Sequence, residues 1–254
     1  MKRKFYIWEG SFKNFKDVRL KKNGIGFNGK YHLNNIKKEY EQIDKQVKQN
    51  KKISIKLTNR IKFLLPSIKK ILKEKNKIKI LDFGGGYGLA FFYLKQELRK
   101  DIEKIEFDLV DMPKITNIIK NKNCKFNIFN EIKKKNYDLI FTSSCIQYIP
   151  KWKLIIKAFC KLKPNNLLFL DLFAGNIKNF VSIQNYYDSK IPQWFLNYDN
   201  FILELKKNNY QIKKKIINQS YRLNKKCFLD MNNFNKKLRL KHTLDVLFTR
   251  NEFR

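Results

Sequence analysis

The sequence predicts an α/β protein: a mostly parallel sheet of seven strands, with helices on both faces and an antiparallel C-terminal strand. Short apolar segments alternate with helical patterns from residue 77 to residue 208, which is typical of βαβ units and a buried parallel sheet. Four glycines separate the first such segment from the helical pattern after it. The last two apolar segments have no clear helical pattern between them, which predicts an antiparallel pair.

The individual elements follow from the same patterns. Apolar residues recur at helical spacing from Ile53 to Lys75 and are interrupted by Pro66, which predicts a kinked or broken helix. Strands are then expected at 77–83, 104–111, 124–129, 137–143, 166–173, 210–217 and 244–250, and helices at 89–100, 115–121, 151–162 and 194–208. We divide the chain into an N-terminal extension, 1–76, and a main domain, 77–254.

The net charge of +34 raises the question of a polyanionic partner such as RNA, because basic surfaces bind phosphates. However, only eight of the 56 basic residues are arginine, the side chain that nucleic-acid readers use for bidentate contacts. The chain is also rich in Asn, Ile, Phe and Tyr, as A/T-rich codons would produce, and its basic runs are scattered. The charge alone therefore does not establish nucleic-acid binding.

Composition indicates a soluble cytoplasmic protein. No apolar run reaches the roughly 18 residues of a membrane span, and the basic start "MKRKFYIWEGSF" lacks the apolar region of a signal peptide. The four cysteines, Cys124, Cys145, Cys160 and Cys227, form no C-x-x-C pair and no cluster with histidine at metal-ligand spacing. We expect free thiols and no metal site.

The stretch "KIKILDFGGGYGLAFFYLKQELRK", residues 77–100, holds the strongest functional signal. A glycine-rich turn between a strand and a helix lets the backbone approach a ligand closely. A dinucleotide-binding fingerprint would require a third glycine where Leu89 stands, which argues against a nicotinamide oxidoreductase. The spacing that is present is D-x-G-x-G-x-G, from Asp82 to Gly88.

With this spacing, "ILDFGGGYG" resembles the first motif of the class I S-adenosylmethionine-dependent methyltransferases, which have a Rossmann-like fold. The resemblance implies that the turn wraps the methionyl part of S-adenosyl-L-methionine and that an acid ending the second strand binds the ribose. Here "FDLVDMP" places Asp111 at that end, whereas Asp108 lies inside the strand. The implied cofactor residues are Asp82, Phe83, Gly84, Gly85, Gly86, Tyr87, Gly88, Asp111, Met112 and Ser143.

Two later segments support the same resemblance. "NYDLIFTSSCIQYIP" is similar to the fourth strand and following loop of the family, and "KLKPNNLLFLDL" to its turn into the fifth strand. Asn165 and Asn166 replace glycines in that turn, a mild change because asparagine tolerates left-handed geometry. The family often has an acid after the third strand; Asn130 or Glu131 is the candidate here.

A narrower resemblance begins at the N-terminus. "WEGSFKNF" together with "LDFGGGYG" and "SSCIQYIP" resembles methyltransferases encoded among bacterial surface-polysaccharide genes. It implies a role in polysaccharide biosynthesis with a sugar or sugar-nucleotide acceptor. Separately, we expect residues 1–76 to form an N-terminal extension, a helical cap over the cofactor site. The alternatives are an RNA methyltransferase, suggested by the charge, and a non-catalytic scaffold of the same fold.

Methyl transfer needs positioning of the acceptor, and an oxygen acceptor also benefits from a base. Gln147 and Tyr148 follow the fourth strand, and Asp171 lies late in the fifth, so all three are expected near the acceptor. Glu9 and Trp8 join them if the N-terminal segment folds over the site. His32 and His242 are weaker candidates for a base, and the oligomeric state is open.

Overall fold

The structure, a computed structural model, describes residues 5–20, 26–120, 125–187, 189–218, 221–222, 225–226 and 229–251. Two of the four cysteines considered above, Cys124 and Cys227, lie outside these residues. The two described cysteines, Cys145 and Cys160, carry free thiols.

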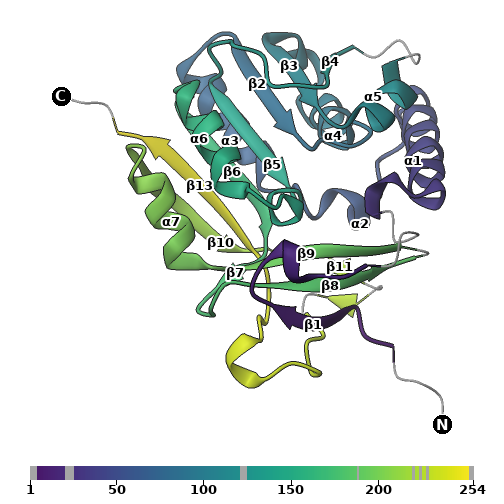
Figure 1. Ribbon diagram of the computed structural model, residues 1–254. Helices are drawn as coiled ribbons and strands as arrows, with labels where there is room; N and C mark the ends of the chain where they lie inside the picture. Colours follow the sequence, from purple (N-terminus) through teal and green to yellow (C-terminus); the bar gives the residue numbers. More distant parts are fainter. Residues whose placement is uncertain are drawn as a thin grey trace.

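The predicted main sheet is confirmed: seven strands in the order β10-β13-β6-β5-β2-β3-β4 (Figure 1). β2 to β6 are parallel, while β13 pairs antiparallel with both β6 and β10. The chain therefore starts in the middle of the sheet, winds to one edge and returns to build the other. The strands are β2 (Ile78–Phe83), β3 (Ile105–Val110), β4 (Asn127–Phe129), β5 (Leu139–Ser143), β6 (Asn166–Leu172), β10 (Tyr210–Ile217) and β13 (Leu244–Arg250).

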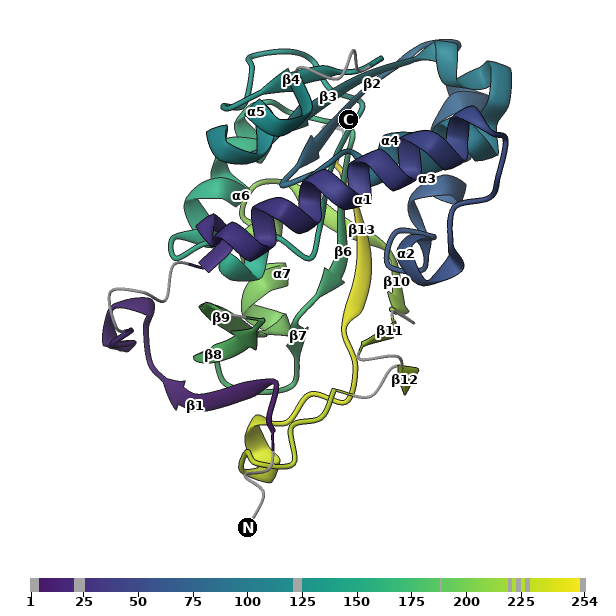
Figure 2. The same ribbon diagram turned by 90° about the vertical axis from the view of Figure 1, so that its right-hand side faces the viewer.

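Helices cover both faces of this sheet, and each face has its own apolar core. The first face carries α1 (Lys30–Lys48), α3 (Leu64–Glu74), α4 (Leu89–Leu98) and α5 (Pro113–Lys120). The second face carries α6 (Trp152–Lys161) and α7 (Tyr198–Lys206). Neighbouring strand residues divide between the faces, as the two-residue period of a strand requires: Ile80 of β2 packs in the first core and Leu81 in the second. Figure 2 shows α1 lying across the first face.

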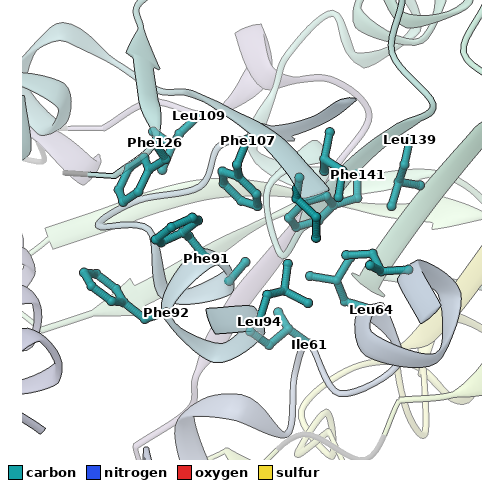
Figure 3. Close-up of a cluster of buried hydrophobic side chains, with 14 of the residues drawn as sticks. Ile61, Leu64, Phe91, Phe92, Leu94, Phe107, Leu109, Phe126, Leu139 and Phe141 are labelled. Carbon is teal, nitrogen blue, oxygen red and sulfur yellow. The ribbon is translucent and has the colours of Figure 1, made fainter. Parts of the chain in front are cut away.

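Aromatic rings dominate the first core (Figure 3). Phe126 contacts Phe91, Phe92 and Phe107 at ring-centroid distances of 4.9, 6.3 and 6.0 Å. Phe107 in turn meets Phe141 of β5. Edge-on and tilted pairs of this kind add to the free energy gained by burying the rings. These contacts fix α4, the helix after the glycines, against β3 and β5.

The expected helix over 53–75 is two helices, α2 (Ile55–Thr58) and α3. The break falls at residues 59–63, before Pro66, and not at the proline itself. Pro66 lies in the first turn of α3, where backbone N–H groups have no partner within the helix. A proline costs little there.

A second, smaller sheet escaped the sequence interpretation. It has the order β1-β8-β9-β7, with β1 (Trp8–Phe12), β7 (Ala174–Gly175), β8 (Phe180–Tyr186) and β9 (Ser189–Asn197). The helix expected at 194–208 therefore begins only at Tyr198, where the side chain of Asn197 caps it by accepting a hydrogen bond from the Asn200 N–H. Most of β9 does alternate buried residues with exposed or half-buried ones, but Gln193 occupies a buried position and hides the apolar pattern.

The smaller sheet lies beyond the carboxyl ends of the main strands (Figure 1). β6 leads almost directly into β7, and the short helix η4 (Ile146–Tyr148), which follows β5, contacts β9. The remaining short elements are η1 (Phe15–Asp17), η2 (Gly26–Asn28), η3 (Arg99–Lys104), η5 (Lys236–Leu238), β11 (Tyr221–Arg222) and β12 (Lys225–Lys226). The carboxyl ends of the main strands are thus covered by β1 from the N-terminal part of the chain and by the strands that follow β6.

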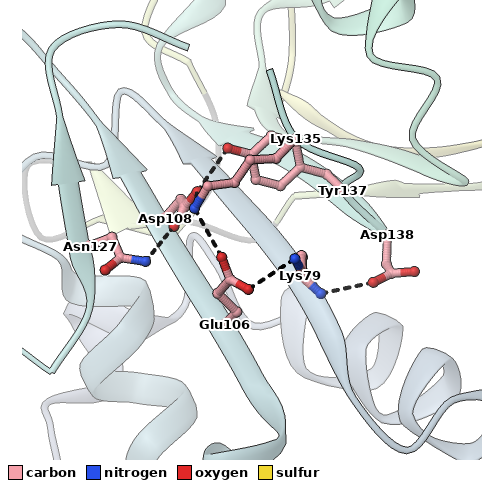
Figure 4. Close-up of polar contacts among 7 residues, drawn as sticks. All are labelled: Lys79, Glu106, Asp108, Asn127, Lys135, Tyr137 and Asp138. Atoms are coloured by element: carbon pink, nitrogen blue, oxygen red, sulfur yellow. Dashed lines mark hydrogen bonds and ion pairs between the residues drawn. The ribbon is translucent and has the colours of Figure 1, made fainter. Parts of the chain in front are cut away.

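Asp108 of β3 belongs to a polar network on the second face of the sheet (Figure 4). Its carboxylate accepts hydrogen bonds from Tyr137 and Asn127, both at 2.8 Å, and pairs with Lys135 at 2.8 Å. Glu106, two residues earlier, pairs with the same lysine at 2.9 Å. Asp108 therefore has a structural setting inside the sheet, away from the end of the strand.

Candidate functional site

The glycine loop, residues 84–88, joins β2 to α4 at the carboxyl end of the central strand. Gly84 has φ +74°, and a Cβ atom there would lie 2.3 Å from the sulfur of Cys145. Gly86 has φ +58°, yet the nearest atom to its missing Cβ is the Cδ1 of Ile36, 3.9 Å away. Packing therefore requires glycine at 84, whereas at 86 the backbone faces space beside α1.

Asp111 lies next to this loop. Its carboxylate accepts a hydrogen bond from the backbone N–H of Gly86 at 2.8 Å and another from Met112 at 2.6 Å. A carboxylate can accept about four hydrogen bonds, so two positions are left for a ligand. Burial raises the pKa of Asp111, while the two N–H donors oppose that shift.

Asp82, near the end of β2, packs directly against the backbone of the same loop at Gly85. It is 2% exposed, and a Cβ on Gly85 would lie 2.6 Å from its Oδ2. Burial raises the pKa of Asp82 well above its ordinary value, and the charge of Asp111 raises it further. Among the described residues, no cation offsets either carboxyl. In a chain of net charge +34, this acidic pair suits a ligand that brings its own positive charge.

The other predicted cofactor residues surround these two acids. Met112, just after Asp111, is 36% exposed and offers an apolar surface beside the carboxylate. Ser143 ends β5 and is half-buried. Tyr87 is buried, and its hydroxyl donates to Glu39 of α1; burial and this carboxylate raise the pKa of Tyr87. Phe83 packs edge-on against Phe159 of α6.

The two candidates for the third-strand position follow β4. Asn130 accepts a hydrogen bond from the hydroxyl of Thr116 at 2.5 Å. Glu131 is exposed and pairs with Lys133 at 2.7 Å. Asn130 is thus the one of the two that α5 holds in place.

Gln147 and Tyr148, both in η4, have different surroundings. Gln147 is fully buried, and neither polar atom of its side chain has a hydrogen-bond partner among the described residues. The hydroxyl of Tyr148 donates to Gln184 of β8 at 2.7 Å. The helix η4 thus connects the glycine loop, through Cys145, to the smaller sheet.

Four ring-bearing residues meet beside η4, and we call them the aromatic cluster: Phe27, His32, Tyr148 and Tyr186. Phe27 contacts the other three at ring-centroid distances of 5.1, 4.8 and 5.8 Å, in that order. The Nδ1 of His32 lies 3.1 Å from the hydroxyl of Tyr186. The exposed pair Tyr31 and Tyr187, 4.5 Å apart, extends the cluster outward.

The sequence interpretation missed most of this cluster. Its members come from η2, α1, η4 and β8, so no local pattern joins them. Two signals were present: the turn-rich "NGIGFNGKYH", residues 23–32, and the paired tyrosines in "QNYYDS", residues 184–189. Only the pairing of distant segments brings the two together.

Asp171 is fully buried at a bulge between β6 and β13, where it adopts φ +52°. Its carboxylate accepts hydrogen bonds from Ser144 and from Thr243, the latter at 2.5 Å. Its backbone N–H donates to Asp245 at 2.9 Å. The carboxylate thus ties the end of β5 to the segment that enters β13.

Asp245 should make the stability of the fold depend on pH. Burial raises its pKa to about 7 from an ordinary 3.8, so the folded state binds this proton more tightly than the unfolded chain. The resulting stability is present below pH 4 and is lost as pH rises through 7, up to about 4 kcal/mol. In urea unfolding from pH 5 to 8, we expect Asp245→Asn to gain stability relative to the wild type as pH rises. A constant difference between the two would contradict the shift.

The N-terminal and C-terminal candidates lie in other settings. Trp8 is buried in the core of the smaller sheet, where its ring meets Phe173 and Phe195 and its N–H donates to Gln193 at 3.0 Å. Glu9 pairs with Lys190 at 3.0 Å on the surface. His242 is half-buried just before β13, and burial lowers its pKa. These contacts do not join Trp8 or Glu9 to the glycine loop.

Two features are absent from the part of the chain that the structure describes. No group of three or more His, Cys, Asp or Glu side chains there could hold a metal ion. No described helix combines the length and apolarity needed to cross a membrane.

A cavity of about 700 Å³ lies at the opposite end of the main sheet, beside the residues that precede β2, β5 and β6. Its only described acid, Asp138, pairs with Lys75. The basic side chains in its lining are Lys75, Lys134, Lys135, Lys161, Lys163 and Arg250.

Comparison with known proteins places this geometry in context. A family model described as a methyltransferase domain matches residues 57–214. No curated protein matches the chain in sequence.

Solved structures share the fold at low sequence identity. An S-adenosylmethionine-dependent methyltransferase from Clostridium acetobutylicum has a TM-score of 0.51 and 13% identity, over 85% of this chain and 99% of its own. The 1,6-didemethyltoxoflavin-N1-methyltransferase of Burkholderia thailandensis, solved with 1,6-didemethyltoxoflavin and S-adenosylhomocysteine, has a TM-score of 0.50 and 8% identity, over 93% of each chain. The magnesium protoporphyrin IX methyltransferase of Synechocystis PCC 6803, solved with S-adenosylhomocysteine, has a TM-score of 0.50 and 8% identity. The match covers 86% of this chain and 98% of its own.

Proposed function

The chain belongs to the family of methyltransferase domains and is an S-adenosylmethionine-dependent methyltransferase, and from this premise we propose that its methyl acceptor is a small molecule or a sugar. The cofactor would supply a methyl group bonded to a positively charged sulfur, and this methyl carbon is open to attack by an oxygen or nitrogen lone pair of the acceptor. We further propose that the glycine loop holds the amino-acid part of the cofactor and that Asp111 binds its ribose.

The acidic pair of Asp82 and Asp111 supports this assignment. The cofactor carries two positive groups, an ammonium and a sulfonium, and the buried carboxyl of Asp82 and the half-buried carboxyl of Asp111 have no cation of their own among the described residues. The two unused acceptor positions on Asp111 match the two vicinal hydroxyls of a ribose. The exposed apolar side chain of Met112 suits the face of an adenine.

The aromatic cluster is the observation that carries the acceptor assignment. Half-buried rings next to a cofactor site bind the flat faces of small ring-shaped ligands, including sugars. The toxoflavin and protoporphyrin enzymes, which share the fold, have ring-shaped substrates in their names.

RNA is the second candidate acceptor, favoured by the net charge and by the basic cavity. That cavity lies at the amino ends of β2, β5 and β6, about 17–23 Å from their carboxyl ends for strands of five to seven residues. A polyanion held there would not by itself present a group to the glycine loop. We therefore rank RNA below a small acceptor.

Labelled methyl transfer tests the proposal. Purified protein is incubated with methyl-labelled S-adenosylmethionine and with separate cell fractions: small molecules, polysaccharide, lipid and RNA. We expect label in the small-molecule or the polysaccharide fraction; the latter would also support a role in surface-polysaccharide biosynthesis. Label confined to RNA would overturn the ranking of acceptors, and binding of S-adenosylhomocysteine without label in any fraction would favour a non-catalytic scaffold.

A further inference from the structure

The buried amide of Gln147 points to a missing partner. The side chain is fully buried with both polar atoms unpaired among the described residues, and an unsatisfied buried group costs roughly 1–3 kcal/mol. Such a group in a folded protein calls for an explanation, and one explanation is a ligand that completes its hydrogen bonds. Gln147 stands between Cys145, which packs on Gly84, and Tyr148 of the aromatic cluster. A molecule bound between the glycine loop and the aromatic cluster would supply the missing hydrogen bonds to this amide.

His32 approaches the same place from α1. Ile36, one helical turn further along α1, is the residue nearest to the missing side chain of Gly86. His32 therefore lies roughly 6 Å along the helix from that contact, on the same side of α1. It is 9% exposed, and burial lowers its pKa, which favours the neutral imidazole.

We propose that His32 accepts the proton that the methyl acceptor loses, and that the acceptor is an O–H or N–H group on a planar ring held by the aromatic cluster and by Gln147. This inference rests on the proposed function. In the step, the lone pair of His32 Nε2 forms a bond to the proton. The electrons of the acceptor's former O–H or N–H bond stay on the acceptor atom, and the imidazole becomes an imidazolium ion.

The contact with Tyr186 can hold His32 in the form that this role requires. If Nδ1 carries the proton and donates it to the tyrosine oxygen, Nε2 keeps its lone pair. Burial raises the pKa of Tyr186 to about 12, so its phenol stays protonated at neutral pH. The titratable groups around His32 and Tyr186 are Tyr31, Tyr148 and Tyr187. The charge of Glu39 raises the pKa of Tyr186, and the charge of Arg60 lowers it.

Nuclear magnetic resonance can test this form directly, because the chain has only two histidines. In histidine-labelled protein we expect the His32 imidazole to titrate below pH 6.5 with its neutral proton on Nδ1. Tyr186→Phe, which keeps the ring and removes the hydroxyl, should move that proton toward Nε2. Saturation with S-adenosylhomocysteine should shift the signals of His32 and leave those of His242 in place. A neutral proton on Nε2 in the wild type, or His32 signals unmoved by the bound ligand, would overturn the inference.

Kinetics give the second readout, in the cell fraction that takes the label. We expect His32→Gln to lower the transfer rate by about 10²- to 10⁴-fold while its affinity for S-adenosylhomocysteine stays unchanged. The wild-type rate should rise with pH through the His32 pKa, and the variant should lose that rise. His242→Gln is the matched control and should behave like the wild type. Transfer by His32→Gln at the wild-type rate would reject the base.

These results separate the two proposals. Failure of the wild type to bind S-adenosylhomocysteine would count against the cofactor assignment itself. Normal binding and transfer together with an unimpaired His32 variant would leave the proposed function standing and remove only the role of His32. A folded His32→Gln protein is established by an unchanged thermal melt.

Discussion

Gly86→Asp is expected to weaken binding of S-adenosylhomocysteine by at least about 100-fold, or about 2.7 kcal/mol. The nearest atom to the missing Cβ of Gly86 is 3.9 Å away, and we assign that space to the cofactor. An aspartate would fill it and add a third acid beside Asp111, whose carboxylate already accepts the Gly86 N–H. Titration calorimetry with S-adenosylhomocysteine measures the effect.

Gly86→Ala is the matched control for backbone strain. Both variants place a side chain at φ +58°, and aspartate tolerates this geometry at least as well as alanine does. Each should therefore lose a similar stability, on the order of 1 kcal/mol. The alanine should weaken binding much less than the aspartate, because it fills less space and carries no charge. If Gly86→Asp bound S-adenosylhomocysteine with wild-type affinity, the assignment of the cofactor to the glycine loop would be rejected.

Asp111→Asn should lower the affinity for S-adenosylhomocysteine by about 10- to 100-fold. Asparagine has the same shape but replaces one acceptor oxygen with a donor and removes the charge, which weakens hydrogen bonds to the ribose hydroxyls. The N–H groups of Gly86 and Met112 would also lose a charged acceptor. Calorimetry on the folded variant gives the affinity.

Asp108→Asn provides the contrast from the same strand. Asp108 is 1% exposed and pairs with Lys135, so asparagine removes the charge from a buried ion pair and leaves Lys135 with Glu106 alone. We expect a loss of about 2–4 kcal/mol in the free energy of unfolding, with unchanged affinity for the cofactor product. If the Asp108 variant lost affinity and the Asp111 variant kept it, the ribose role would belong elsewhere.

Most of the main sheet could be predicted because its signals are local. β10 and β13 match the expected segments, and the apolar runs of β2 and β5 mark buried parallel strands wherever they fall in the chain. The glycine turn could be interpreted for the same reason, since its spacing lies within nine residues. The choice of Asp111 over Asp108 needed only the rule that ligands meet parallel strands at their carboxyl ends.

The smaller sheet could not be predicted because long-range pairing defines it. β1 pairs with β8 across more than 170 residues, with Trp8 opposite Gln184. No periodicity in "WEGSF" indicates that partner, and Gln193 breaks the apolar alternation of β9. The same holds for the acceptor side: His32 meets Tyr186 only after the smaller sheet has formed. The sequence offered His32 only as a weaker candidate for a base, because a lone histidine in a turn-rich segment does not show which residues will surround it.

The most direct test of the account is a crystal structure of the protein with S-adenosylhomocysteine. We predict that both ribose hydroxyls lie within hydrogen-bond distance of the Asp111 carboxylate and that the amino-acid part follows the backbone from Gly84 to Gly88. A ligand bound elsewhere, with Asp111 still paired only to backbone N–H groups, would contradict the assignment.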